Sequence, residues 1–290
     1  MPRRSLAFVF IVFAMLATGL STRAEAATIK WDKIIGIDIG KLSAQQKARV
    51  KTLLESIKNT RGCKDTLAVC LSKDDMTARR HAGFVARMVR KGKDDTSIKE
   101  GIKSRKESSH PEEILEIDTS DHPYKGNTKA KVVIIEYACF QCPFCAHLAT
   151  KLKKLKSKFG NKIVHYFKFY PVLSHDRGVP SALAGLAAHR QGKFWPMHDI
   201  MFKNRSDLDD EDLAKYAKKI GLDMTKFKQA LNDKSSMKYV ERDKLEGMRI
   251  GVEGTPTFFI NGKLFDGVQD YEEIVDRIAE ELDIVEGRIK

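Results

Sequence analysis

The spacing of apolar residues divides this chain into two parts with different periods. Up to about residue 106, apolar residues recur three or four positions apart, which is typical of amphipathic helices. Ser43 is a predicted N-cap, and helices are expected directly after it and over 77–91 and 97–105. The sequence therefore predicts an all-α N-terminal domain over 27–106, in the form of a three-helix bundle, followed by a polar linker over 107–113.

From residue 114 onward, short β-branched and aromatic runs alternate with helical patterns, which indicates an α/β domain over 114–290. The predicted strands are 114–117, 132–137, 162–170, 257–260 and 263–265, the last two joined by an Asn-Gly turn. The predicted helices are one that starts at Ala146 and continues through Phe159, then 180–190, 194–202, 210–220, 224–231, 236–250 and 270–282. Five of these helices form an insertion over about 176–250, between the second central strand and the final hairpin.

The first residues predict export. Two arginines precede an apolar run from Leu6 to Leu20, and Ala24-Glu25-Ala26 supplies the small residues of a cleavage site. The run is short for a membrane span, which needs about 20 residues, and a retained anchor is the alternative. We therefore predict a signal peptide over 1–26 and a mature chain that is periplasmic or secreted, where disulfides persist.

A Cys-x-x-Cys pair stands where the run 132–137 gives way to a helical pattern. In Cys142-Pro143-Phe144-Cys145, the first thiol would lie beside the unpaired N–H groups and the positive dipole end of a helix, which lowers the pKa of a thiol. The pattern predicts thiol–disulfide exchange, with Cys142 as the nucleophile and Cys145 as the resolving thiol. Half of a zinc site or a structural disulfide is the alternative for such a pair taken alone.

The stretch from about residue 120 to 285 resembles the DsbA-like branch of the thioredoxin superfamily. The resemblance is carried by Glu136, by the segment FQCPFC that ends at Cys145, and by the Gly-Thr-Pro segment 254–256 before a strand. It implies a thioredoxin-like fold with an inserted helical cap. It also implies that Glu136 lies beneath the reactive pair as a proton acceptor or tuner of Cys145, and that Thr255 and a cis Pro256 bind the substrate backbone.

Cys139 makes the cysteine count odd and departs from the pattern of the family. Three roles stay open for it: a buried inert thiol, a third thiol that modulates Cys142, and a metal ligand together with Cys142 and Cys145. A structural zinc site takes four ligands, and no fourth ligand is adjacent. We therefore predict no metal and no cofactor.

Cys63 and Cys70 stand in the loop between the first two predicted helices. A structural disulfide there would restrict the unfolded chain and stabilise the bundle by about 2 to 4 kcal/mol. The alternative is a second redox pair that passes electrons to or from Cys142 and Cys145. The segment 81–102 is weakly similar to the cytochrome c maturation protein CcmH, whose cysteines form a Cys-x-x-Cys, whereas six residues separate Cys63 and Cys70. We predict the structural disulfide.

A net charge of +13 raises the question of an anionic partner. The lysines are scattered along the chain, and the densest cluster lies on the polar side of the helix that follows Cys145. We interpret this cluster as a solvated helix face, and no nucleic-acid partner is predicted.

These features together predict an extracytoplasmic thiol–disulfide oxidoreductase that acts on protein cysteines, more readily as an oxidase. One alternative is a disulfide isomerase or reductase, which could serve cytochrome c maturation through the helical domain. Another is a non-catalytic binding or chaperone module that keeps a structural disulfide. A redox partner protein in the membrane is expected, and the helical domain is a candidate for homo-oligomer formation.

Overall fold

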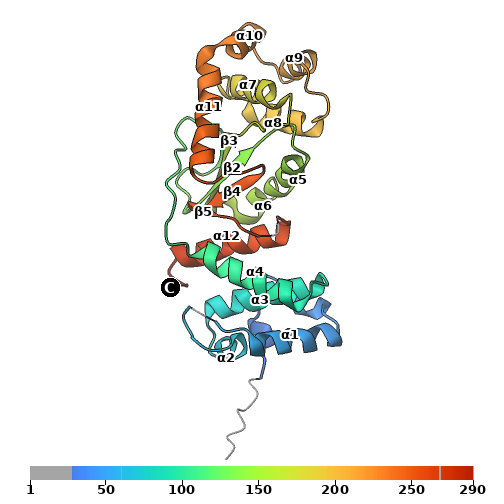
Figure 1. The fold of residues 1–290 in the computed structure, drawn as a ribbon, viewed down its shortest axis with the longest axis vertical. Coiled ribbons are helices and arrows are strands. Elements are labelled where there is room, and N and C mark those ends of the chain that lie inside the picture. Colours follow the sequence, from blue (N-terminus) through green and yellow to red (C-terminus); the bar gives the residue numbers. More distant parts are fainter. Residues whose placement is uncertain (1–27, 60, 268, 290) are drawn as a thin grey trace, which may run out of the picture.

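The computed structural model describes residues 28–59, 61–267 and 269–289, so the predicted signal peptide over 1–26 lies outside the described residues. Figure 1 shows two units stacked along the long axis of the molecule. Helices from the N-terminal part form one end, and a sheet with its covering helices forms the other. The last helix of the chain, α12, lies between them.

The N-terminal unit is helical throughout. In the described residues its elements are η1 (Trp31–Lys33), η2 (Ile39–Lys41), α1 (Ala44–Ser56), α2 (Leu67–Ser72), α3 (Met76–Arg90) and α4 (Asp95–Ser109). Each α-helix begins after a side chain that accepts a hydrogen bond from a backbone N–H of the first turn; these caps are Ser43, Thr66, Asp75 and Asp94. The apolar faces of the four α-helices share one core, centred on residues such as Val50, Leu54, Leu67, Val85 and Ile98.

The prediction of a three-helix bundle is wrong in two respects. It missed α2, whose six residues are too few to establish a helical period. It also ended the last helix too early, because α4 continues to Ser109 and so includes the start of the predicted linker over 107–113. This stretch is polar, but Ser109 is buried against α12, and hydropathy does not reveal a buried polar face.

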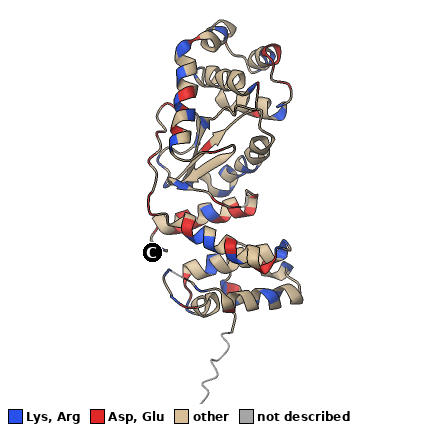
Figure 2. Cartoon of the chain, in the orientation of Figure 1, with Lys and Arg blue, Asp and Glu red and all other residues tan. Residues whose placement is uncertain are grey.

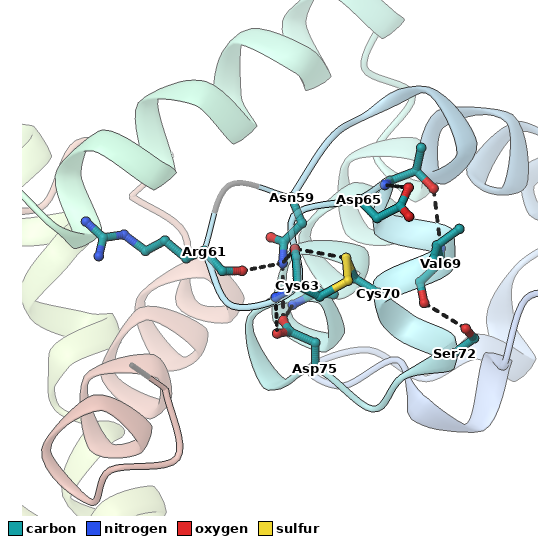
Figure 3. The surroundings of a disulfide bond; sticks show 10 residues. Asn59, Arg61, Cys63, Asp65, Val69, Cys70, Ser72 and Asp75 are labelled. Atoms are coloured by element: carbon teal, nitrogen blue, oxygen red, sulfur yellow. Dashed lines mark hydrogen bonds between the residues drawn. A yellow bond between two sulfur atoms is a disulfide. The ribbon is translucent and has the colours of Figure 1, made fainter.

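A disulfide joins Cys63, in the loop before α2, to Cys70 within it, with 5.5 Å between the two Cα atoms (Figure 3). Asp75 accepts hydrogen bonds from the backbone N–H of Cys63 (3.0 Å) and from the side chain of Asn59 (3.2 Å). Asp75 also accepts a hydrogen bond from the backbone N–H of Ala78, and this bond caps the start of α3. The disulfide loop is therefore tied to the start of α3, and Cys70 is fully buried.

The second unit is built on a five-stranded sheet with the strand order β1-β3-β2-β4-β5. The strands are β1 (Tyr124–Gly126), β2 (Val132–Ala138), β3 (Ile163–Phe169), β4 (Thr257–Ile260) and β5 (Lys263–Leu264). β2 and β3 are parallel, and the other three pairings are antiparallel. Because β2 and β3 are buried on both faces, their sequences are almost continuously apolar.

The edge strand predicted at 114–117 is not present as a strand. Leu115 makes one backbone hydrogen bond, from its N–H to the carbonyl of Gly262 (3.0 Å), and no ladder follows from it. The first strand is β1 instead, which directly follows Pro123 and ends at Gly126. Gly126 has a positive φ of 116°, and a Cβ there would lie 2.5 Å from the carbonyl oxygen of Ile163, so β1 approaches β3 closely only with glycine at this position.

Helices cover both faces of the sheet. α5 (Pro143–Leu152), α6 (Leu155–Phe159) and α12 (Tyr271–Val285) pack on one face, and η3 (Gly160–Lys162) leads into β3. The helices between β3 and β4 are α7 (Gly178–His189), α8 (Phe194–Lys203), α9 (Asp210–Lys219), α10 (Met224–Asn232) and α11 (Lys234–Arg249). The predicted fold class, a thioredoxin-like domain with a helical insertion after a small all-α unit, is confirmed. The helix expected to run from Ala146 to Phe159 is divided into α5 and α6 by a turn at Lys153 and Lys154.

The two units meet through buried ion pairs. Arg87 of α3 donates to Glu273 (2.5 Å) and Asp276 (2.7 Å) of α12, and its side chain is fully buried. Arg105 of α4 pairs with the same Asp276 (2.7 Å) and with Glu280 (2.9 Å). Figure 2 shows charged residues of both signs where α12 meets α3 and α4.

This contact changes the interpretation of the last helix. Its apolar residues Ile274, Ile278 and Leu282 pack under the sheet, as their spacing predicts. Its charged side would normally face water, but here the helical unit covers it. The sequence pattern therefore cannot distinguish α12 from a surface helix, although α12 is enclosed on both sides.

Replacing Arg87 with methionine is expected to lower the free energy of unfolding by about 3 to 5 kcal/mol, because Glu273 and Asp276 would lose a buried partner. The matched control on the same helix is Arg90→Met, which removes a partly exposed pair with Glu272 and should cost about 1 kcal/mol or less. Urea unfolding measures both losses. Equal, small losses would contradict a buried ionic interface.

The free energy of unfolding should also fall in mild acid. Burial lowers the pKa of His81, on α3, to about 3, so the folded chain keeps this imidazole neutral where the unfolded chain would protonate it. Stability from this group is present above the ordinary histidine pKa and is lost as the pH falls below it. Between pH 7 and 5 the loss should be about 2 kcal/mol, and His81→Gln should remove it. Parallel stability curves for the variant and the unsubstituted chain would refute this assignment.

Candidate active site

Cys142 is the N-cap of α5 and lies in extended backbone conformation, with φ −71° and ψ 123°. Pro143 occupies the first turn, where a missing N–H costs nothing. The carbonyl of Cys142 accepts the first helical hydrogen bond, from the N–H of Ala146. The sulfur therefore lies at the positive end of α5, as the Cys-x-x-Cys pattern led us to expect.

The loop before Cys142 is held by the cap helices. The ring of Phe140 is buried among aromatic residues, with centroid distances of 5.2 Å to Phe167 and 5.0 Å to Phe202. Gln141 donates to Asp176 (2.7 Å) and accepts from the N–H of Arg177 (2.8 Å), just before α7. These contacts fix the reactive loop from the side of the helical insertion.

The pKa of Cys142 is lowered to about 5. The largest cause is the hydrogen bond that the thiol of Cys145 gives to the Cys142 sulfur, and the backbone N–H groups of Cys145 and Phe144 add to it. Burial acts in the opposite direction. Cys142 is therefore a thiolate at neutral pH in the reduced state.

The pKa of Cys145 is shifted in the opposite direction. It is fully buried, and burial raises the pKa of its thiol far above the usual range. Its hydrogen bond to Cys142 and the nearby charge of Glu136 raise the pKa further. The two sulfurs of one short motif thus differ strongly in acidity: Cys142 holds the charge and Cys145 holds the proton.

Glu136 is fully buried on β2, on the side of the sheet that α5 covers. One carboxylate oxygen, Oε2, lies 2.9 Å from Nε2 of His165 on the neighbouring strand β3. The other, Oε1, has no hydrogen-bond partner among the described residues. Glu136 is thus close enough to influence the Cys145 thiol and is linked to a histidine behind it.

The Thr255–Pro256 peptide bond is cis. The carbonyl oxygen of Thr255 lies 3.3 Å from the sulfur of Cys142, and the carbonyl of Pro256 accepts a bond from Gln269 (3.1 Å), just before α12. Two apolar side chains are unusually exposed: Phe144, in the first turn of α5, at 71%, and Leu173, in the loop after β3, at 94%.

Cys139 is a free, buried thiol. Its sulfur lies 3.2 Å from Nδ1 of His175, and burial raises the pKa of the thiol. Across the described residues, no group of three or more His, Cys, Asp and Glu side chains could hold a metal ion.

The structure brings together most of the residues that the sequence singled out. Cys142, Cys145, Glu136, Thr255 and Pro256 converge at the end of β2, whereas Cys63 and Cys70 lie in the helical unit, beyond α12 (Figure 1). Sequence reasoning missed His165 as the partner of Glu136. The signal was available in the alternation of β3, because His165 is a polar residue within a strand that is otherwise mostly apolar on both faces.

Comparison with known proteins gives the family. The model of the Thioredoxin family matches residues 118–280, which is more than half of the chain. This chain belongs to the thioredoxin family. Because the match begins at residue 118, it does not test the similarity of the helical unit to CcmH, which stays a prediction.

Solved structures agree on the fold. BdbD from Bacillus subtilis in its oxidised form superimposes with a TM-score of 0.53 at 23% identity, covering 57% of this chain and 95% of BdbD. The thiol-disulfide exchange protein alpha-DsbA2 from Wolbachia pipientis gives 0.51 at 23% identity, covering 62% and 94%. A thioredoxin-like oxidoreductase from Silicibacter pomeroyi gives 0.52 at 20% identity, covering 57% and 94%. Within the family, the predicted DsbA-like form of the fold is confirmed.

Curated relatives include much longer proteins. The Na(+)/H(+) antiporter NhaA of Herminiimonas arsenicoxydans is 34% identical over 150 residues, which are 52% of this chain and 24% of the antiporter. NhaA 1 of Salinispora arenicola is 31% identical over 163 residues, 56% of this chain and 25% of the antiporter. The matched stretch thus spans about a quarter of these relatives. In the part of this chain that the structure describes, no helix has the length and apolar character of a membrane span.

Substituting Cys145 with alanine is expected to raise the pKa of Cys142 from about 5 toward the ordinary thiol value, because the main hydrogen-bond donor to the thiolate is lost. The rate of alkylation of the reduced protein as a function of pH measures this pKa. Cys139→Ser is the control and should leave the midpoint near 5. An unchanged midpoint in Cys145→Ala would mean that the helix end alone stabilises the thiolate.

Proposed function

We propose that this protein is an extracytoplasmic thiol–disulfide oxidoreductase that exchanges disulfides with cysteines of client proteins through Cys142 and Cys145. The observation that carries the proposal is the opposed acidity of the two thiols at the start of α5. Only a thiolate attacks a disulfide, and a thiol of low pKa is also the better leaving group. Cys142 meets both requirements.

In the oxidising direction, a client thiolate attacks the Cys142 sulfur of the Cys142–Cys145 disulfide. A bond forms between the client and Cys142, the Cys142–Cys145 bond breaks, and Cys145 leaves. Because Cys145 is fully buried, it must take up a proton as it leaves, and Glu136 is the nearby group that can supply it. A second client thiolate then attacks the client sulfur and releases Cys142 as a thiolate.

The acidity of Cys142 favours the oxidase role over the reductase role. Stabilising the thiolate stabilises the reduced protein, which makes the disulfide form the stronger oxidant. In this fold the reactive cysteine has a pKa of about 7 in the reductant thioredoxin and about 3.5 in the oxidant DsbA. The value of about 5 for Cys142 lies between them.

We assign client binding to the region around Thr255 and Pro256. The exposed side chains of Phe144 and Leu173 offer apolar contact to an unfolded client. The Cys63–Cys70 bond belongs to the scaffold, since Cys70 is buried and the loop is tied to α3. The predicted signal peptide and this disulfide both support a location outside the cytoplasm. A membrane protein is the kind of partner that would reoxidise the reduced chain.

The oxidised protein should convert a reduced two-cysteine peptide to its disulfide in a stoichiometric reaction, and Cys142→Ser should abolish this conversion. Cys145→Ser should accumulate a mixed disulfide between Cys142 and the peptide, detected by mass spectrometry. The Cys63→Ser, Cys70→Ser double variant, which lacks only the scaffold disulfide, should keep the activity. Undiminished conversion by Cys142→Ser would rule the proposal out, and faster reshuffling of a scrambled disulfide than oxidation would favour the isomerase alternative.

A further inference from the structure

Glu136 cannot exchange its proton with water directly, because it is fully buried. The proposed mechanism nevertheless requires Glu136 to exchange a proton with solvent once in each cycle. The proton that Cys145 gains comes from solvent, and the proton that Cys145 loses returns to it. The route must therefore begin at one of the two carboxylate oxygens. Oε1 has no partner among the described residues, and Oε2 meets Nε2 of His165 at 2.9 Å.

His165 lies between Glu136 and a small cavity. Its side chain is 11% exposed, whereas that of Glu136 is not exposed at all. The cavity measures about 20 Å³, which is room for one water molecule, and His165, Trp195 and His198 line it together with Ala149 and Leu152. One ring nitrogen of His165 thus contacts the buried carboxylate while the ring borders a space that water can enter.

Charged side chains line the part of the cavity nearest the surface. Lys153, in the turn after α5, and Asp199 of α8 both line it and form an ion pair at 2.7 Å. Their side chains are 62% and 44% exposed, so the cavity borders on the surface. Lys125 of β1 lies over the ring of Trp195, with 5.3 Å between its Nζ and the ring centroid. Lys125, Lys153 and Asp199 thus place charged groups around the cavity that His165 lines.

His198 supplies a second polar wall. Its Nδ1 lies 3.0 Å from Asp199, and its Nε2 is buried without a partner among the described residues. Burial lowers the pKa of His198, so its ring is neutral at physiological pH. A neutral ring with one unpartnered nitrogen beside a cavity of this size is a suitable contact for a bound water.

We propose that His165 relays protons between Glu136 and water in the cavity that it shares with His198, each time Cys145 gains or loses its proton. When Cys145 leaves the disulfide, a proton passes from Nε2–H of His165 through the Glu136 carboxylate to Cys145, and the other ring nitrogen of His165 takes one from water. The reverse sequence removes the proton on reoxidation. This inference rests on the function proposed above. His165 acts through Glu136 and never contacts the reacting sulfurs.

The test separates the two steps of a single turnover. Opening of the Cys142–Cys145 disulfide by a one-cysteine peptide needs the proton, whereas release of Cys142 by a second peptide thiolate does not. In His165→Ala, opening should slow by about 10-fold or more, release should be unchanged, and added imidazole should restore opening. His165→Gln, which can still donate to Glu136 but cannot relay, should be equally slow. His189→Gln is the matched control, since His189 contacts the backbone carbonyl of Asp121 and is not among the residues that line the cavity.

Two results would overturn the relay. One is opening at the normal rate in both His165 variants, and the other is equal slowing of opening and release without rescue by imidazole, which would indicate a structural role. Failure of the unsubstituted protein to form any mixed disulfide would instead refute the proposed function. Normal turnover by the unsubstituted protein and by His189→Gln keeps the two failures distinguishable.

Discussion

The hydrogen bond from the Cys145 thiol to the Cys142 sulfur is the interaction on which the rest of this site depends. It fixes which of two chemically identical groups carries charge and which carries the proton. The start of α5 and the burial of Cys145 impose this difference together, because the Cys142 sulfur lies beside free N–H groups and the Cys145 sulfur is fully buried. The aromatic cluster around Phe140 and the contacts of Gln141 hold the loop in the position that the hydrogen bond requires.

The buried Cys145 thiol changes its protonation state in each cycle and therefore needs a route for the proton. This requirement explains why Glu136 lies at the centre of the sheet. Glu136 would be unfavourable in a β-strand that is buried on both faces unless it had a partner, and His165 on the adjacent strand provides one. The same requirement, that buried charge be paired, recurs at the other end of the domain. There α12 presents Glu273, Asp276 and Glu280 to arginines of the helical unit, so the two units form one continuous packed structure.

Local patterns predicted the elements well where a helix had one apolar face or a strand formed a continuous apolar run. The inserted helices, the central strands and the cap at Ser43 all follow from spacing and capping chemistry. Predictions were wrong where tertiary contacts decide the outcome. The end of α4 was interpreted as a linker because it is polar, whereas its burial depends on α12, through a contact between Ser109 and Glu280 that are 171 residues apart in the sequence. His165 is recognisable in the sequence as a polar residue in an apolar strand, but its partner Glu136 is 29 positions earlier and only the pairing of the two strands brings them together.

The central claim is that the site stabilises the Cys142 thiolate and so makes the protein an oxidant. Equilibration of the Cys142–Cys145 pair with glutathione tests it most directly, in the Cys63→Ser, Cys70→Ser variant so that the scaffold disulfide does not contribute. The account predicts a reduction potential above that of thioredoxin, which is about −270 mV. A potential at or below that value would contradict it.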